Sequence, residues 1–117
     1  LTVPAFNVIW QRDANSYALR SLEHCSAPPE ILNVTGAETL SVREAAEFFA
    51  SRFGRPCLYT GEEGPAALLS DSSRCRSLLG PPELTTEQLL ELVAAWVSGG
   101  GASLNKATHF DVADGRF

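Results

Sequence analysis

The residues best suited to bind a small molecule stand together near the start of this 117-residue chain. Val8-Ile9-Trp10 predicts a short strand, and Asp13 has the character of a helix N-cap. Side chains that join a strand end to a helix start are common ligand contacts in α/β folds. Trp10 could stack on a ring, and Gln11 or Arg12 could donate hydrogen bonds. The alternative is that Trp10 belongs to the core and Asp13 serves only as a cap.

Other reactive side chains do not form a known catalytic motif. The sequence has no glycine-rich dinucleotide loop after a strand, no P-loop and no G-x-S-x-G elbow. His24 and Cys25 are neighbours on a predicted helix, where successive side chains point about 100° apart, so they do not form a nucleophile–base pair. His109, Asp111 and Asp114 stand close together in the tail. They could form a metal cluster, but a solvated polar face is the simpler interpretation.

Composition and charge limit the class of protein. The formal charge of −5 argues against broad binding to nucleic acid or to an anionic membrane surface. No apolar run reaches the roughly 18 residues that span a bilayer. The three cysteines, Cys25, Cys57 and Cys75, are odd in number and contain no C-x-x-C pair. We therefore expect reduced thiols in a cytoplasmic protein.

The clearest local signals lie between residues 31 and 56. Ile31 to Thr35 predicts a strand, and Gly36 ends it. Ser41 and Glu44 form a capping box in front of a helix with one apolar stripe. Gly54 followed by Pro56 stops that helix. The unit is a strand followed by a well-capped helix.

The remaining elements complete a single small α/β domain over residues 1–117, with three or four helices and a small sheet of short strands. The tail 99–117 is expected to be a glycine-rich exit followed by a β-like segment. The further predicted elements are a helix from Asp13 to His24 or Cys25, a strand over Cys57–Thr60, a helix from Ser70 or Asp71 to Leu79, and a helix capped by Thr85 and Gln88.

The order of these segments resembles the C-terminal part of the NAD(P)-dependent epimerase/dehydratase family, the extended short-chain dehydrogenase/reductases. Asn7 to Ala14 is similar to that family's strand and "Asp-hydrophobic-Ala" helix start, and Ile31 to Gly36 to its next strand. The similarity continues through Leu40–Ala46, Asp71–Pro82 and Thr85–Trp96. It covers roughly residues 7 to 98.

The resemblance implies a substrate-side lobe. The family's cofactor loop and Tyr-x-x-x-Lys pair lie upstream in a Rossmann domain, and neither occurs here, since Tyr17 has no Lys four residues on. It therefore implies a fragment that is inactive alone and holds no cofactor, with NAD(P) bound by the full-length parent. The implied partners are the N-terminal Rossmann domain and a small-molecule substrate. Asn7, Trp10 and Gln11 become the candidate substrate-facing residues.

Two departures from the family refine this expectation. The family's diphosphate-binding arginines have no counterpart near Phe6 or in the loop Gly61–Pro65, where Glu62 and Glu63 would repel a diphosphate. A substrate other than a nucleotide sugar is therefore expected. A second hypothesis is a non-catalytic protein-interaction module derived from the family. In either case the missing half leaves apolar surface uncovered, which predicts a homodimer.

Overall fold

The structure is a computed structural model that describes residues 1–67 and 69–106. These residues form two short strands and four α-helices, which confirms the predicted small α/β fold. The elements, in chain order, are β1 (Ala5–Phe6), α1 (Gln11–Arg20), a 3₁₀ turn (Ser21–His24), β2 (Leu40–Ser41), α2 (Val42–Phe53), α3 (Ser73–Leu79) and α4 (Thr86–Ser98). Of the predicted tail 99–117, residues 107–117 lie outside the described residues.

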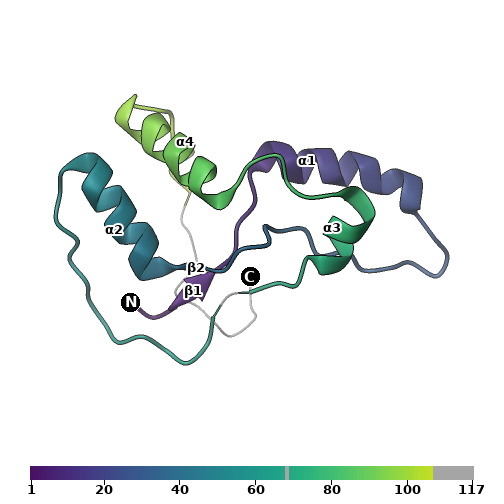
Figure 1. Cartoon of the computed structure of the whole chain (residues 1–117), viewed down its shortest axis with the longest axis horizontal. Coiled ribbons are helices and arrows are strands. Elements are labelled where there is room, and N and C mark those ends of the chain that lie inside the picture. Colours follow the sequence, from purple (N-terminus) through teal and green to yellow (C-terminus); the bar gives the residue numbers. More distant parts are fainter. Residues whose placement is uncertain (68, 107–117) are drawn as a thin grey trace.

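The small sheet lies between two groups of helices. In Figure 1, α2 and α4 stand on one side of β1 and β2, and α1 and α3 stand on the other. The molecule measures 50 × 33 × 25 Å, and its radius of gyration is 16.2 Å. A compact domain of this length has a radius of roughly 13 Å. The fold is therefore open, and much apolar surface stays in contact with solvent.

The sheet does not lie where the sequence predicts its first strand. β1 and β2 pair antiparallel with Ala5 opposite Ser41 and Phe6 opposite Leu40. The amide of Val42 extends the pairing by donating to the carbonyl of Pro4. The strand predicted at Val8–Trp10 is wrong because no strand of the described residues pairs with it. Its backbone bonds are one from Gly36 N–H to the Val8 carbonyl and the first bond of α1, from Ala14 N–H to the Trp10 carbonyl.

Two further strand predictions are also wrong. Ile31–Thr35 and Cys57–Thr60 have no regular secondary structure. An apolar, β-branched run becomes a strand only when another strand supplies its hydrogen bonds. Within the described residues no strand lies beside Ile31, whose side chain is 85% exposed. Both segments have the composition of a strand, but no strand of the described residues lies beside them to pair with.

The helix boundaries around α2 and α4 follow their predicted caps. The Ser41 hydroxyl accepts the Glu44 N–H at 3.3 Å, and Gly54 closes α2 in the left-handed conformation at φ 62°. In α4 the Thr85 hydroxyl accepts the Gln88 N–H, and the Gln88 side chain accepts the Thr85 N–H. The Thr85–Gln88 capping box is confirmed, whereas the structure shows only the Ser41 half of the predicted Ser41–Glu44 box. Each of these bonds satisfies a backbone group that a helix end otherwise leaves unbonded.

The buried core joins α1 to α3. Tyr17, Cys75 and Leu79 are between 0% and 4% exposed, and Ile9 and Leu32 pack against them. The Tyr17 hydroxyl donates to the Gly80 carbonyl at 2.7 Å, which ties the two helices together. This small cluster holds in place the segments that carry the candidate site.

Asp13 has a different role from the predicted one. Helix α1 begins at Gln11 with Trp10 as its N-cap, so Asp13 lies inside the first turn. Its carboxylate is 5% exposed and accepts the Leu84 N–H at 3.4 Å. The acid lies near the positive end of the helix dipole. It links α1 to the loop in front of α4.

Candidate functional site

A hollow of about 190 Å³ lies where three distant segments meet. Its walls are residues 8–10, 36–38, 81–82, 84–86 and 89, so it lies between the start of α1 and the start of α4. The walls are mostly apolar, with polar groups from Glu38, Thr85 and Thr86. A concave, largely apolar surface with a few polar groups is the usual form of a small-molecule site.

Gly36 allows the segments to approach closely enough to form the hollow. Its N–H donates to the Val8 carbonyl at 3.0 Å, and its own carbonyl accepts from the Ser72 hydroxyl at 3.4 Å. A Cβ at this position would lie 2.1 Å from the Val8 oxygen. Only glycine fits here, because every other residue would push the two backbones apart.

Trp10 is the predicted site residue that lines the hollow. Its ring is half-buried, and the Arg12 guanidinium lies 5.4 Å from the ring centroid. Arg12 also lies 3.9 Å from Glu83, whose segment borders the same opening. The cation over the indole keeps one ring face occupied. Any ligand in the hollow would therefore meet the indole edge or its other face.

Asn7 and Gln11 lie elsewhere. The Asn7 amide donates to the Ser70 carbonyl at 2.7 Å and accepts the Ser70 N–H at 3.2 Å, as a strand backbone would. It also donates to the Gly36 carbonyl at 3.5 Å, so its polar atoms are engaged in structure. Gln11 is exposed at the first residue of α1 and does not line the hollow. Substrate contact by these residues stays a prediction.

Sequence reasoning missed the second wall of the hollow. Pro81 and Pro82 lie between two predicted helices and Leu89 lies within the second, so none of them was singled out as a site residue. Their approach to Trp10 depends on long-range bonds such as Asp13 to Leu84, which no local pattern reports. The glycine at position 36 was a usable signal, because a close backbone approach is one reason for a glycine beside a strand-like run.

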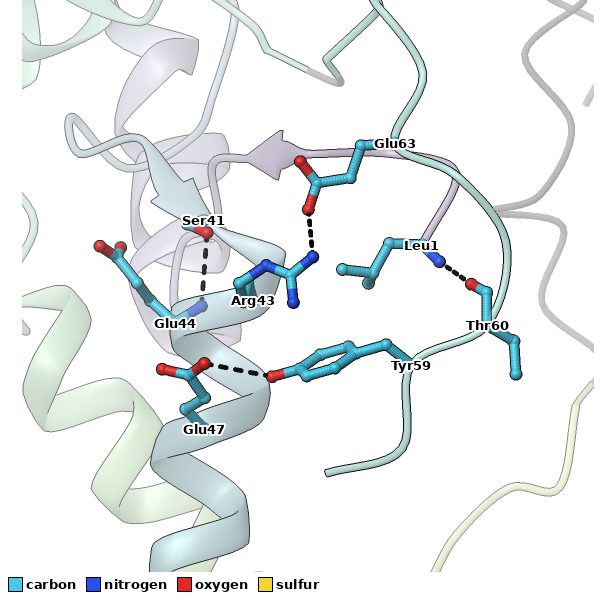
Figure 2. Close-up of polar contacts among 8 residues, drawn as sticks. All are labelled: Leu1, Ser41, Arg43, Glu44, Glu47, Tyr59, Thr60 and Glu63. Atoms are coloured by element: carbon cyan, nitrogen blue, oxygen red, sulfur yellow. Dashed lines mark hydrogen bonds and ion pairs between the residues drawn. The ribbon is translucent and has the colours of Figure 1, made fainter. Parts of the chain in front are cut away.

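A second polar cluster holds the loop after α2 against the N-terminal segment (Figure 2). The Arg43 guanidinium donates to the Glu63 carboxylate at 2.8 Å and lies 4.4 Å from the Tyr59 ring centroid. The Tyr59 hydroxyl lies 3.4 Å from a Glu47 carboxylate oxygen, and the Leu1 amino group donates to the Thr60 carbonyl. Glu63, one of the two loop acids that would repel a diphosphate, is thus paired with Arg43.

This cluster is suited to holding structure rather than to proton transfer. A hydrogen bond with the Cys57 thiol, partial desolvation and the nearby Glu47 charge raise the pKa of Tyr59 to about 12. The phenol therefore stays protonated at neutral pH and acts as a donor. The hydrogen bond that Arg43 donates to the Glu63 carboxylate raises the pKa of Arg43, so that side chain stays charged. Neither group titrates near neutrality, where general acid–base catalysis needs its groups.

Other chemistries find little support in the part of the chain that is described. Among residues 1–67 and 69–106, no three His, Cys, Asp or Glu side chains gather as metal ligands would. The tail residues of the alternative metal cluster lie outside this range. No described helix is both long and apolar enough to cross a bilayer. The three cysteines are free thiols.

Comparison with solved structures places this geometry in a known architecture. No protein-family model matches the sequence, and no curated protein is detectably similar to it. The chain is similar in structure to the UDP-glucuronic acid 4-epimerase from Bacillus cereus, solved in complex with NAD, with a TM-score of 0.64 and 17% sequence identity. The superposition covers 83% of this chain.

The similarity concerns only part of that epimerase. It covers 32% of the epimerase chain, so this chain spans about a third of the length of its structural neighbour. The fold is therefore that of a portion of an NAD-dependent epimerase. At 17% identity the likeness is one of fold, in agreement with the sequence resemblance.

Proposed function

We propose that this chain is the substrate-binding C-terminal region of an NAD(P)-dependent epimerase, dehydratase or reductase that acts on a sugar or another small molecule. The observation that carries the proposal is the match of 83% of the chain to about a third of an epimerase. The order of sequence motifs leads to the same family independently. The hollow beside Trp10 gives this region a surface on which a small molecule can rest.

In this proposal the cofactor and the redox chemistry belong to the rest of the parent protein. The 117 residues contain neither a glycine-rich dinucleotide loop nor a Tyr-x-x-x-Lys pair. The parent would move a hydride between the nicotinamide and a substrate carbon. The role of this region is to bind and orient the substrate, and alone it is inactive. NAD as the parent's cofactor is supported by the NAD bound to the structural neighbour.

The proposed partner is an N-terminal Rossmann domain, and the open fold supports it. Ile31, Leu19 and Leu22 are 85%, 70% and 68% exposed, whereas large aliphatic side chains that belong to a hydrophobic core are buried. The sequence around Ile31 has the composition of a strand, but among the described residues no strand pairs with it. Pairing with a sheet would cover both the side chains and the backbone groups.

The same surface supports a homodimer when the chain is alone. Unpaired strand-like segments associate readily, and exposed apolar patches promote the association. Sedimentation at high micromolar concentration tests this, with a dimer expected for the wild type and a monomer for Ile31→Lys. A wild-type monomer would count against it. The reduced state of the cysteines fits the proposed cytoplasmic location.

The alternative function is a non-catalytic interaction module derived from the same fold. The structural pairing of Arg43 with Glu63 and the engagement of Asn7 favour it, because both leave few free polar groups for a substrate. The coding sequence upstream of Leu1 separates the two functions. An in-frame glycine-rich loop and Tyr-x-x-x-Lys pair support the enzyme, and an initiator Met directly before Leu1 supports the module.

Calorimetry on the chain itself adds a second test of the proposed function. NAD, NADH, NADP and NADPH should each give no measurable heat of binding, because the proposed cofactor site lies on the other domain. Tight binding of any of them would refute the proposal. Trp10→Phe is the control for any heat that comes from a nucleotide binding in the hollow beside Trp10. Phe keeps an aromatic ring there but lacks the indole N–H.

A further inference from the structure

The size of the hollow beside Trp10 limits what it can bind. Its volume is about 190 Å³, whereas sites for drug-sized ligands span about 300–1,000 Å³. An apolar cavity of about 150 Å³ is large enough to admit benzene. The hollow therefore matches one six-membered ring in size and is too small for a whole nucleotide sugar.

Both walls of the hollow are held in place by the chain itself. The Gly36 N–H donates to the Val8 carbonyl at 3.0 Å, and the Leu84 N–H donates to the Asp13 carboxylate at 3.4 Å. The two prolines at positions 81 and 82 stiffen the second wall, because their rings fix the φ angle. A ring that enters the hollow meets an ordered surface, so binding costs little conformational entropy of the chain.

One carboxylate dominates the electrostatics of the hollow. Of the described residues that line it, Glu38 alone has an ionisable side chain. Glu38 is exposed, and it takes part in no ion pair among the described residues. The Arg12 guanidinium over the Trp10 ring is offset by Glu83, whose carboxylate lies 3.9 Å away. Together these two carboxylates and one guanidinium leave one negative charge at the opening.

This charge discriminates between classes of ring compound. A phosphate or carboxylate on the ring would lie beside Glu38 with no cation among the described lining residues to neutralise it, so like charges would repel. A neutral ring gains no more than a hydrogen bond from Glu38. A ring with a protonated amine can place its cation at Glu38 and its apolar body against the apolar walls.

We propose that the hollow selects a single six-membered ring that carries a protonated amine. The amine donates to the Glu38 carboxylate, and the ring lies against the Trp10 indole and Leu89. The inference names the substrate class of this site, and it rests on the proposed function only in taking the ligand to be a substrate. An amino sugar and a cyclic alkylamine share this chemistry.

Three ring compounds that differ in charge test the proposal: cyclohexylamine, cyclohexanol and cyclohexanecarboxylate. The fluorescence of Trp10 reports their binding in a Trp96→Phe background, since the chain has two tryptophans. The amine should bind about two- to fivefold more tightly than the alcohol, as expected for one solvent-exposed ion pair, and the carboxylate should bind least. Added salt should reduce the preference for the amine. Equal affinity for all three compounds, or no binding of any, would overturn the proposal.

Matched variants locate the charge that discriminates. Glu38→Gln should lower the affinity for the amine to that for the alcohol and leave binding of the alcohol unchanged. Glu62→Gln, which removes an exposed carboxylate that does not line the hollow, should keep the preference for the amine. Equal loss of the preference in both variants would mean general attraction to an acidic protein and would overturn the proposal.

Two further comparisons complete the experiment. Glucosamine measured beside cyclohexylamine identifies the source of the amine: tighter binding of glucosamine assigns an amino sugar, and tighter binding of cyclohexylamine assigns a cyclic alkylamine. The coding sequence upstream of Leu1 separates this inference from the proposed function. A preference for the amine without an upstream Rossmann domain would refute only the proposed function, whereas an upstream Rossmann domain without that preference would refute only this inference.

Discussion

Replacing Gly36 by alanine is the sharpest test of how the hollow is built. The new Cβ would lie 2.1 Å from the Val8 oxygen, about 1 Å closer than real Cβ contacts allow. The two backbones must separate, and the 3.0 Å hydrogen bond from Gly36 N–H to Val8 breaks. Losing that bond costs about 1 kcal/mol, and the forced backbone shift costs about 1–3 kcal/mol. The free energy of unfolding should fall by about 2–4 kcal/mol.

Gly54→Ala provides the matched control. Gly54 has φ 62°, but a Cβ there would meet nothing within 4 Å, so only the left-handed backbone conformation is penalised. That penalty is about 1–2 kcal/mol. Urea unfolding followed by circular dichroism measures both variants against the wild type. Since 1 kcal/mol shifts the melting temperature by about 4 °C at this size, the two should also differ in thermal melts.

The relative stability of the two variants decides the outcome. Gly36→Ala should be the less stable protein and should also lose ligand access to the indole, seen as a change in iodide quenching of Trp10 fluorescence in a Trp96→Phe background. If Gly36→Ala equals the wild type in stability, the close approach of Val8 and Gly36 does not exist in solution. The hollow would then lose its structural basis.

Three further predictions concern the core, a helix cap and pH. Tyr17→Phe should lower the free energy of unfolding by about 1 kcal/mol, because the ring still packs but the bond to the Gly80 carbonyl is lost; a thermal melt measures it, and no loss would place the hydroxyl in solvent. Thr85→Ala should cost about 1 kcal/mol and Thr85→Ser much less, because serine keeps the oxygen that accepts the Gln88 N–H; chemical unfolding that shows equal losses would contradict the cap. Burial raises the pKa of Cys75 and of Tyr17 above their ordinary 9.0 and 10.0, so both stay neutral in the folded chain while the unfolded chain ionises. Stability that is complete below about pH 9 should therefore decline as pH rises further, and Cys75→Ala should flatten that decline in urea titrations.

The sequence predicts the helices well because their signals are local. Ser41, Gly54 and Thr85 each act within a few residues of the backbone groups they satisfy. Such signals work whether or not the rest of a protein is present. The limits of α2 and α4 are correct to within a residue or two for this reason.

The strands show what a local pattern cannot determine. Ile31 to Thr35 and Cys57 to Thr60 have strand composition, yet a strand also needs a neighbour at the right distance. The observed pair, β1 with β2, places Ala5 opposite Ser41, a residue already assigned to a helix cap. No pattern within one segment reports that Pro4, Ala5 and Phe6 find their partners 34 to 38 residues later.

The candidate site was predictable only on one side. Trp10 stood out by its place between an apolar run and a helix, and it does line the hollow. The opposite wall comes from Pro81 to Leu89, which reach it through contacts that are distant in sequence. Asn7 was a candidate through the family resemblance, but its amide bonds hold Ser70. A side chain's bonding capacity does not reveal its partner.

The bonds that close the core also determine the order in which the chain can fold. Tyr17 meets Gly80 across 63 positions of sequence, and Asp13 meets Leu84 across 71. During synthesis, α1 emerges long before those partners exist. A ten-residue helix is marginal in water without tertiary support. Helix α1 must therefore wait, with its future core face open to chaperones or to misfolding, until residues 80–84 have been synthesised.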